Sequence, residues 1–268
     1  MIPKVLQDEL RTQYNPDGSH LRNIQLVSLD ILKEIDRICQ KCDIKYILSS
    51  GTLLGAVRHG GFIPWDDDVD IEMLKEEFDK FLSVLPEELS KDYVLHSYAN
   101  DPYFIHSFIK IREKKIDVPG VHPLSQKYNQ HGCFVDVFPI QKMSKFSSKI
   151  SKSLFSKLLW KPLRKYDLGL AYITMVRFLL VKIIFPLLSL LSFCGEKAYF
   201  HSKGSAFRKP RKKEYLTQIK RIEFEGVHFN APLDTHGYLT DLYGDYLDFP
   251  ENKQSHLDIA KRDHIIAS

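Results

Sequence analysis

The residues best suited to chemistry form an acidic cluster with the sequence DDDVDIE. In a β-strand successive side chains point to opposite faces, so Asp68, Asp70 and Glu72 are predicted to share one face while the apolar residues between them meet the core. Carboxylates so close together repel each other unless a cation is bound. Mg²⁺ suits such a site because it takes hard oxygen ligands and leaves room for phosphates, and Mn²⁺ is the alternative. A solvated acidic turn would explain Asp66 and Asp67, but not the alternating residues after them.

A third carboxylate, Asp136, lies inside the strongly β-forming run FVDVF. A buried carboxylate without a partner is costly. A neighbouring strand that carries Asp68 and Asp70, with metal between the strands, would remove that cost. Three such carboxylates can hold one or two Mg²⁺ ions and stabilise the attacking and leaving oxygens of a phosphoryl transfer. Asp136 is also a candidate base for an incoming hydroxyl.

Upstream of the acidic cluster, Gly51 and Thr52 stand between a predicted strand and a predicted helix. Free backbone N–H groups at a helix start, next to a residue without a side chain, can cradle a phosphate. A Gly-Thr pair is weak evidence alone, and its place before the acidic strand strengthens it. We therefore expect this pair to contact the phosphates of a substrate.

Four cations are candidates to neutralise phosphate charge: Arg58 and His59 after the short helix, and Lys110 and Arg112 on one face of the run FIHSFIKIR. A structural salt bridge is an equally good account of each. Trp65 lies beside the carboxylates and could stack on a base or on a choline-like cation, or could anchor the core.

These residues need a sheet to bring them together. Hydrophobic periodicity and β-forming runs predict elements that alternate between helix and strand. The predicted helices span 20–42, 53–58 and 75–85, and the predicted strands span 44–49, 69–73, 93–98, 104–112 and 133–138. Pro86 is expected to end the third helix. The result is an α+β fold, with a mixed sheet flanked by helices, over roughly the first 140 residues.

The middle of the chain has a different composition. Between Lys142 and Lys165 there are eight Lys or Arg and no acid, and Leu168 to Cys194 is dominated by Leu, Ile, Phe and Val. Arg177 and Lys182 lie inside that apolar run, where a central charge costs about 2.5–3.5 kcal/mol in a spanning helix. A basic segment beside an apolar helix is typical of a segment in the membrane interface. An internal helical hairpin and a spanning helix are the alternatives.

The 268 residues and the net charge of +4 fit a folded protein with one main core. A second basic stretch lies at 203–221, and a hairpin is predicted around Gly226, followed by a helix at 238–243. No basic-then-apolar leader opens the sequence, and Cys39 and Cys42 lack a second pair for a zinc site. These features fit the reducing cytoplasm. The domains are predicted as a catalytic core at 1–145, a helical insert at 146–214 and a C-terminal part at 215–268 that packs on the core.

The block GTLLGAVRHGGFIPWDDDVDIEM at 51–73 closely resembles the signature of the LicD family, which is related to the fukutin group and to the nucleotidyltransferase-fold superfamily. FVDVFP at 134–139 resembles that family's third-carboxylate strand, and YLTDLYGDYLDFP at 238–250 its C-terminal part. The resemblance implies a nucleotidyltransferase-like fold in which Gly51-Thr52 contacts phosphate. It further implies that Asp68, Asp70 and Asp136 bind metal. Fifteen residues separate Thr52 from Asp68, more than in the simplest nucleotidyltransferases, so the nucleotide contacts stay open.

The resemblance also implies a reaction: Mg²⁺-dependent transfer of phosphocholine from CDP-choline to a hydroxyl of a surface glycan such as teichoic acid, lipopolysaccharide or capsule, with release of CMP. The alternative donor is CDP-glycerol or CDP-ribitol. The expected acceptor is a lipid-linked glycan, and the expected location is the inner face of the plasma membrane, with peripheral contact through 146–200. A third hypothesis is a non-enzymatic binder of membranes or nucleic acid. It leaves the three embedded carboxylates unexplained, so no nucleic-acid partner is expected.

Overall fold

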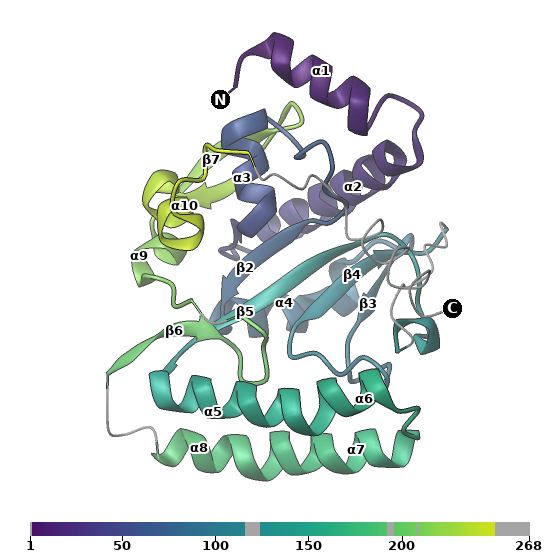
Figure 1. The fold of residues 1–268 in the computed structure, drawn as a ribbon, viewed down its shortest axis with the longest axis vertical. Helices are drawn as coiled ribbons and strands as arrows, with labels where there is room; N and C mark the ends of the chain where they lie inside the picture. Colours follow the sequence, from purple (N-terminus) through teal and green to yellow (C-terminus); the bar gives the residue numbers. More distant parts are fainter. Residues whose placement is uncertain (1, 116–123, 192–195, 208, 250–268) are drawn as a thin grey trace.

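The computed structural model describes residues 2–115, 124–191, 196–207 and 209–249. Its centre is a six-stranded sheet in which β1, β2, β5, β4 and β3 lie side by side in that order, and β6 pairs with the far end of β5 (Figure 1). The strands are β1 (Ile47–Leu48), β2 (Asp70–Leu74), β3 (Tyr93–His96), β4 (Ile109–Glu113), β5 (Phe134–Ser144) and β6 (Lys197–His201). β2 and β5 are parallel and the other pairs are antiparallel, so the predicted mixed sheet is confirmed.

Helices cover the sheet and connect its strands. The helix α2 (His20–Lys41) matches the prediction, and the Ser19 side chain caps its start by accepting a hydrogen bond from the Arg22 N–H. Its buried apolar residues recur at helical spacing and join the main core. α1 (Lys4–Tyr14) precedes it and was not predicted. Cys39 and Cys42, at the end of α2, are free thiols.

Two shorter helices flank β2 in sequence. α3 (Ser50–His59) begins three residues earlier than predicted, so Gly51 and Thr52 lie in its first turn. α4 (Lys75–Glu88) runs past Pro86 instead of stopping there. In the last helical turn a proline removes only one hydrogen bond, and the Leu89 N–H still closes on the Leu85 carbonyl.

Strand lengths differ more from the predictions. β1 has two residues where 44–49 was predicted, and β4 begins at Ile109 instead of residue 104. Phe104 and Ile105 are buried in a loop, so the apolar run there marks burial and not pairing. β5 continues to Ser144 because its second half pairs with β6.

The C-terminal part packs on the same core as the sheet. The hairpin of β7 (Ile219–Phe224) and β8 (Val227–Pro232) turns through Glu225 and Gly226, which both have positive φ, as a type I′ turn requires. α9 (Lys213–Thr217) precedes it and α10 (Thr235–Tyr243) follows it. Phe224, Phe229 and Leu239 are fully buried in the main core, and the predicted hairpin and helix are confirmed.

Residues 145–191 form a helical hairpin beneath the sheet (Figure 1). The first arm comprises α5 (Lys145–Phe155), a π-helical stretch (Ser156–Trp160) and α6 (Lys161–Lys165). The second arm comprises α7 (Leu170–Phe178), a π-helical stretch (Leu179–Ile184) and α8 (Phe185–Leu191). The arms share a second apolar core that includes Phe155, Ile173 and Leu180. In the described residues, the helix Leu170–Leu190 is long and apolar enough to cross a membrane, and most of it is not buried.

Candidate active site

The site is built where the two parallel strands meet. Asp70 on β2 is the direct register partner of Asp136 on β5, and Lys110 on β4 is the register partner of Asp136 from the other side. Register partners point to the same face of a sheet, so three adjacent strands place two carboxylates and one ammonium in a row. The Lys110 Nζ donates to Asp136 Oδ1 at 2.6 Å. Asp136, which is sixty-six residues beyond Asp70, is therefore its neighbour, as the sequence predicted.

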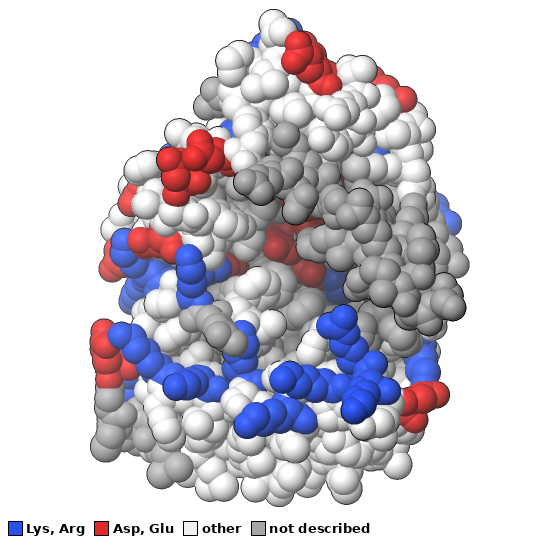
Figure 2. Space-filling view, viewed as in Figure 1, with Lys and Arg blue, Asp and Glu red and all other residues white. Residues whose placement is uncertain are grey.

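A pocket of about 690 Å³ opens over this row. Asp66, Asp68, Asp70 and Asp136 line its acidic part, together with Ser50 and Gly51 at the start of α3. Figure 2 shows acidic atoms in the middle of this face of the molecule, above a row of basic side chains. The position of Asp66 differs from the sequence reading, which made it a loop acid. The tight turn at 63–66, closed by the Asp66 N–H on the Ile63 carbonyl, folds it back over Gly51.

The electrostatics of the row favour a bound cation. Desolvation, then the neighbouring Asp68 and Asp136, hold the pKa of Asp70 well above its usual range. Desolvation also raises the pKa of Asp136, although Lys110 opposes that rise. Burial therefore disfavours the ionised form of both carboxyls, and a bound cation would offset that penalty.

The donor set fits a hard divalent ion, because four carboxylates face one pocket and oxygen is the ligand that Mg²⁺ takes. Within the described ranges, however, no three His, Cys, Asp or Glu side chains converge into a closed metal-binding group. Lys110 already engages one oxygen of Asp136. A cation here would be shared between protein carboxylates and the phosphates of a substrate, which is the usual arrangement for Mg²⁺.

Gly51 and Thr52 hold the acidic wall in place. The Thr52 hydroxyl accepts a hydrogen bond of 2.8 Å from the Asp70 N–H, which fixes the first residue of β2 against α3. A Cβ on Gly51 would lie 2.7 Å from Asp66 Oδ2, so a side chain at this position would displace that carboxylate. Gly51 lines the pocket at the start of α3, which agrees with a phosphate-facing position, whereas the Thr52 hydroxyl is directed to the backbone of β2.

Glu72 shares the face of Asp70 but has a different environment. Its fully buried carboxylate accepts hydrogen bonds from Arg211 at 2.7–3.0 Å and is 2.9 Å from His201 Nε2. Burial raises its pKa, but Arg211 and His201 outweigh burial and lower it to about 2. Glu72 is therefore a structural anchor that ties β6 and the segment before α9 to the sheet.

Three predicted binding residues lie away from the pocket lining. The buried Arg58 guanidinium donates to the carbonyls of Tyr246 and Asp248, and His59 contacts Gln7. Trp65 is 7% exposed and its ring meets Tyr14 and His59 edge-on. Arg58 and His59 lie in the last turn of α3 and Trp65 in the loop that follows it, and all three contact residues of α1 or of the C-terminal part. None of the three lines the acidic pocket, and the core-anchor alternative describes Trp65.

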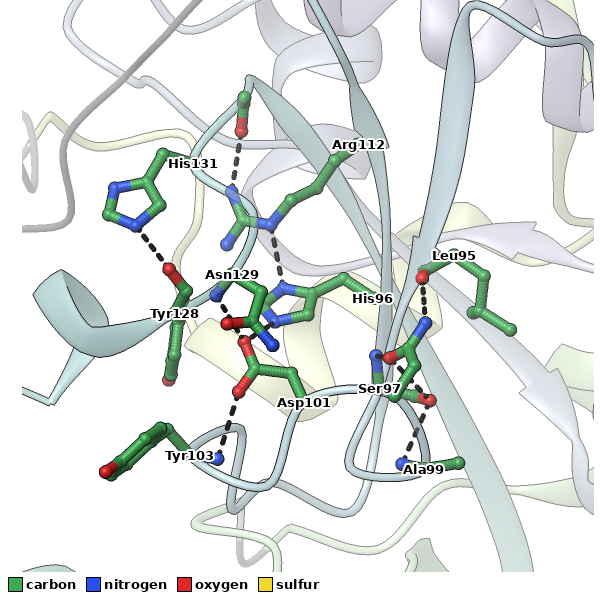
Figure 3. Close-up of polar contacts among 12 residues, drawn as sticks. Leu95, His96, Ser97, Ala99, Asp101, Tyr103, Arg112, Tyr128, Asn129 and His131 are labelled. Carbon is green, nitrogen blue, oxygen red and sulfur yellow. Dashed lines mark hydrogen bonds and ion pairs between the residues drawn. The ribbon is translucent and has the colours of Figure 1, made fainter.

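Arg112 also has structural partners. Its Nε donates to His96 Nδ1 at 2.9 Å and its guanidinium reaches the Gly132 carbonyl, while His96 pairs with Asp101 (Figure 3). Desolvation lowers the pKa of His96 to about 4, and this agrees with a neutral ring that accepts from Arg112. Of the two predicted cations on β4, Lys110 contacts the site and Arg112 supports the loops behind it.

Sequence reasoning missed most of the aromatic wall of the pocket. Phe108, Phe138, Trp160, Phe207 and Tyr243 line the same pocket as the acids, together with His106. Phe138 and Asp136 are two residues apart in β5 and so share a face, whereas Phe108 lies in the bend before β4. That spacing could have revealed Phe138. Trp160 and Phe207 come from the helical hairpin and from the loop after β6, and no local pattern links them to the acids.

The chain is similar to known proteins over this region and beyond. Residues 43–169 match the family model described as LicD/FKTN/FKRP, nucleotidyltransferase domain. The lipopolysaccharide cholinephosphotransferase LicD of Haemophilus influenzae is 28% identical over 88% of this chain and 95% of its own length. The human ribitol 5-phosphate transferase FKRP is 45% identical over 40 residues, which are 15% of this chain and 8% of FKRP. An uncharacterised protein of Rickettsia prowazekii is 32% identical over 54% of each chain.

Proposed function

This chain belongs to the LicD family and is a phosphotransferase, and on that premise we propose that it transfers phosphocholine from CDP-choline to a hydroxyl of a cell-surface glycan. The observation that carries the proposal is the pocket that combines acidic and aromatic walls. The acidic wall suits a cation shared with phosphates, and the aromatic wall suits a base or a quaternary ammonium. The order of Gly51-Thr52, the Asp-x-Asp strand and the third carboxylate also supports a nucleotidyltransferase-like fold.

Each residue of the site has a role in this reaction. Asp68, Asp70 and Asp136 would hold Mg²⁺, or Mn²⁺, which would neutralise charge on the donor phosphates. Ser50 and Gly51, at the start of α3, line the same pocket, and a free backbone N–H group there would suit a phosphate oxygen. Lys110 holds Asp136 and adds positive charge beside the reacting phosphate.

The chemical step is an in-line displacement at the β-phosphorus of CDP-choline. The acceptor oxygen forms the new bond to phosphorus, and the bond from that phosphorus to the oxygen of CMP breaks. Asp136 takes the hydroxyl proton, and CMP leaves as the second product.

The direct test is to incubate the purified chain with CDP-choline, Mg²⁺ and extracted lipid-linked glycan, and to measure CMP and labelled glycan. Asp68→Asn and Asp136→Asn should abolish both products. Asp67→Asn is the matched control, because Asp67 has the same charge and does not line the pocket. Full activity in both pocket variants would rule out the carboxylate mechanism.

The second candidate donor is CDP-ribitol or CDP-glycerol, which the partial similarity to FKRP supports. A thermal-shift panel with the three CDP compounds and Mg²⁺ separates the donors, since the true one should stabilise the fold most by mass action. Trp160→Leu should reduce the shift from CDP-choline more than the shift from CDP-glycerol if the indole holds the ammonium. If Trp160→Leu reduces the thermal shifts from both compounds equally, the aromatic wall would be assigned to the cytosine base.

We also propose that the chain works at the inner face of the plasma membrane. The outer face of α7 and α8 leaves Met175, Phe178, Leu187 and Leu190 between 53% and 64% exposed. Contiguous exposed apolar surface of this kind marks an interaction site, and nearby lysines favour anionic lipid. Flotation with vesicles of phosphatidylglycerol tests this placement: Phe178→Ser with Leu190→Ser should weaken association. The control is Val5→Ser, an exposed apolar position on α1.

A further inference from the structure

A row of cations borders the catalytic pocket and has no part in the mechanism above. Lysines recur every three to five residues along α5 and its continuation, and they line one side of a groove of about 560 Å³, here called the lysine groove. Its lysines are Lys145, Lys149, Lys152, Lys157 and Lys161. Phe200, Phe207 and Pro210 line the other side. The basic row is visible across the lower part of the face in Figure 2.

The charge of the lysine groove is poorly balanced. Lys145 pairs with Glu196, an exposed partner at the rim. Lys152 donates to the Ala206 carbonyl. For Lys149, Lys157 and Lys161, no acidic partner occurs among the residues that the structure describes. Like charges three or four residues apart on a helix destabilise it, so a bound anion would relieve the repulsion.

The lysine groove adjoins the catalytic pocket. Lys152, Ser156 and Phe207 line both cavities, so a molecule bound in the groove lies next to the pocket that holds the carboxylates. α5 lies between the sheet and α8 (Figure 1). The groove therefore stands between the apolar outer face of the hairpin and the acidic row.

We infer that the lysine groove is the binding subsite for a phosphate group of the acceptor. A lipid-linked glycan has three chemical parts in order: an apolar chain, a phosphate linkage and sugar hydroxyls. The molecule presents matching surfaces in the same order: the apolar face of α7 and α8, the lysines of α5 and the carboxylates of β2 and β5. This inference deepens the proposed transfer reaction, on which it rests for the nature of the acceptor.

Two sources of phosphate share this chemistry: the acceptor itself and the head groups of surrounding anionic lipids. Only the acceptor must also reach the catalytic pocket. The test therefore compares a soluble phosphate probe, a lipid surface and turnover in one set of variants.

The test variant of the full chain is Lys149→Gln with Lys157→Gln and Lys161→Gln. The matched control is Lys4→Gln with Lys33→Gln and Lys91→Gln, which lowers the net charge equally at exposed lysines outside the groove. Binding of inorganic pyrophosphate is measured by calorimetry in EDTA, where the acidic pocket attracts no anion. The groove variant should bind at least about tenfold more weakly than the parent chain, from three lost charge contacts. The control should bind like the parent.

The other two measurements identify the source. Flotation with phosphatidylglycerol vesicles reports head-group binding, and the KM for lipid-linked glycan reports acceptor binding. The inference expects a raised acceptor KM, an unchanged KM for CDP-choline and an unchanged kcat in the groove variant. Parent-like pyrophosphate binding would overturn it, and so would a loss of vesicle binding with an unchanged acceptor KM. Because the calorimetric result needs no turnover, a failure of the proposed donor chemistry would leave it standing.

Discussion

Two carboxylate sites stand two residues apart on the same face of β2, and they behave in opposite ways. At one, Asp70 lies beside Asp136 with little compensating charge, and its pKa is held well above the usual range. At the other, Glu72 lies between Arg211 and His201, and its pKa is lowered to about 2. The backbone, the strand and the side-chain direction are shared. The difference comes only from what the rest of the chain brings to each carboxylate.

The difference separates a functional site from a structural one. A buried carboxylate that receives its own cation is neutralised within the fold and leaves no charge to offer a ligand. A carboxylate grouped with others lowers the stability of the fold until an external cation binds. Binding of that cation is therefore favoured, because it removes the repulsion. Perturbed carboxyl pKa values in a pocket are accordingly a signature of function. Four variants would break or sharpen this contrast.

The largest effect is expected at Asp70. Asp70→Asn should lower transfer by about a thousandfold or more, which corresponds to at least about 4 kcal/mol of transition-state stabilisation. The same change should raise the melting temperature without divalent ions, because the folded-state pKa is raised and ionised Asp70 costs stability at neutral pH. Mg²⁺ should stabilise the parent chain and not the variant. If the parent chain and Asp70→Asn have the same melting temperature without divalent ions and the same response to Mg²⁺, the distinction between the two sites is removed.

The opposite pattern is expected at Glu72. Glu72→Gln should lower the free energy of unfolding by about 3 kcal/mol at pH 7, because Arg211 remains buried without its counter-charge. The folded-state pKa is depressed, so this contribution is present above the ordinary value of 4.5 and fades as the pH falls towards about 2. Urea unfolding of both chains at several pH values measures the gap. The paired change Glu72→Gln with Arg211→Gln is the control, and it should cost less than the sum of the single changes.

The sequence allowed part of this contrast to be predicted. The alternation of DDDVDIE places Asp68, Asp70 and Glu72 on one face, and FVDVF identifies a partner strand, because both signals are local. The local sequence could not distinguish the functional carboxylate Asp70 from the structural carboxylate Glu72. Arg211 is 139 residues from Glu72 and reaches it only when β6 pairs with β5. The same reason explains Arg58 and Arg112, whose partners lie in loops and in the C-terminal part.

The fold shows the same limit. Long periodic helices and the hairpin at Gly226 were predicted well, since their signals lie within a few residues. Strand lengths were predicted less well. The apolar residues Phe104 and Ile105 suggested a strand, but they are buried in a loop. Lys152 and Phe207, which join the lysine groove to the acids, come from elements that no local pattern places there.

A smaller effect is expected at Thr52, which connects α3 to the acidic strand. Thr52→Val removes the acceptor of the Asp70 N–H and should cost about 1–3 kcal/mol in unfolding free energy. Thr52→Ser keeps the hydroxyl and is the matched control. If Thr52 positions Asp70, the valine variant should also show a weaker melting-temperature shift with Mg²⁺, whereas the serine variant should not. A valine variant with a parent-like Mg²⁺ shift would mean that the hydroxyl serves stability alone.

The smallest effect is expected at Asp66, which tests how far the acidic site extends. Asp66 lines the pocket and contributes less than Asp68 and Asp136 to the raised pKa of Asp70. Asp66→Asn should therefore lower transfer by less than about tenfold, with a pH profile displaced to lower pH because Asp70 loses one repelling neighbour. The pH dependence of CMP release measures both quantities, with Asp67→Asn as the control. A loss as large as that of Asp70→Asn would make Asp66 a full member of the cation site, and an unmoved profile would return it to the loop acids.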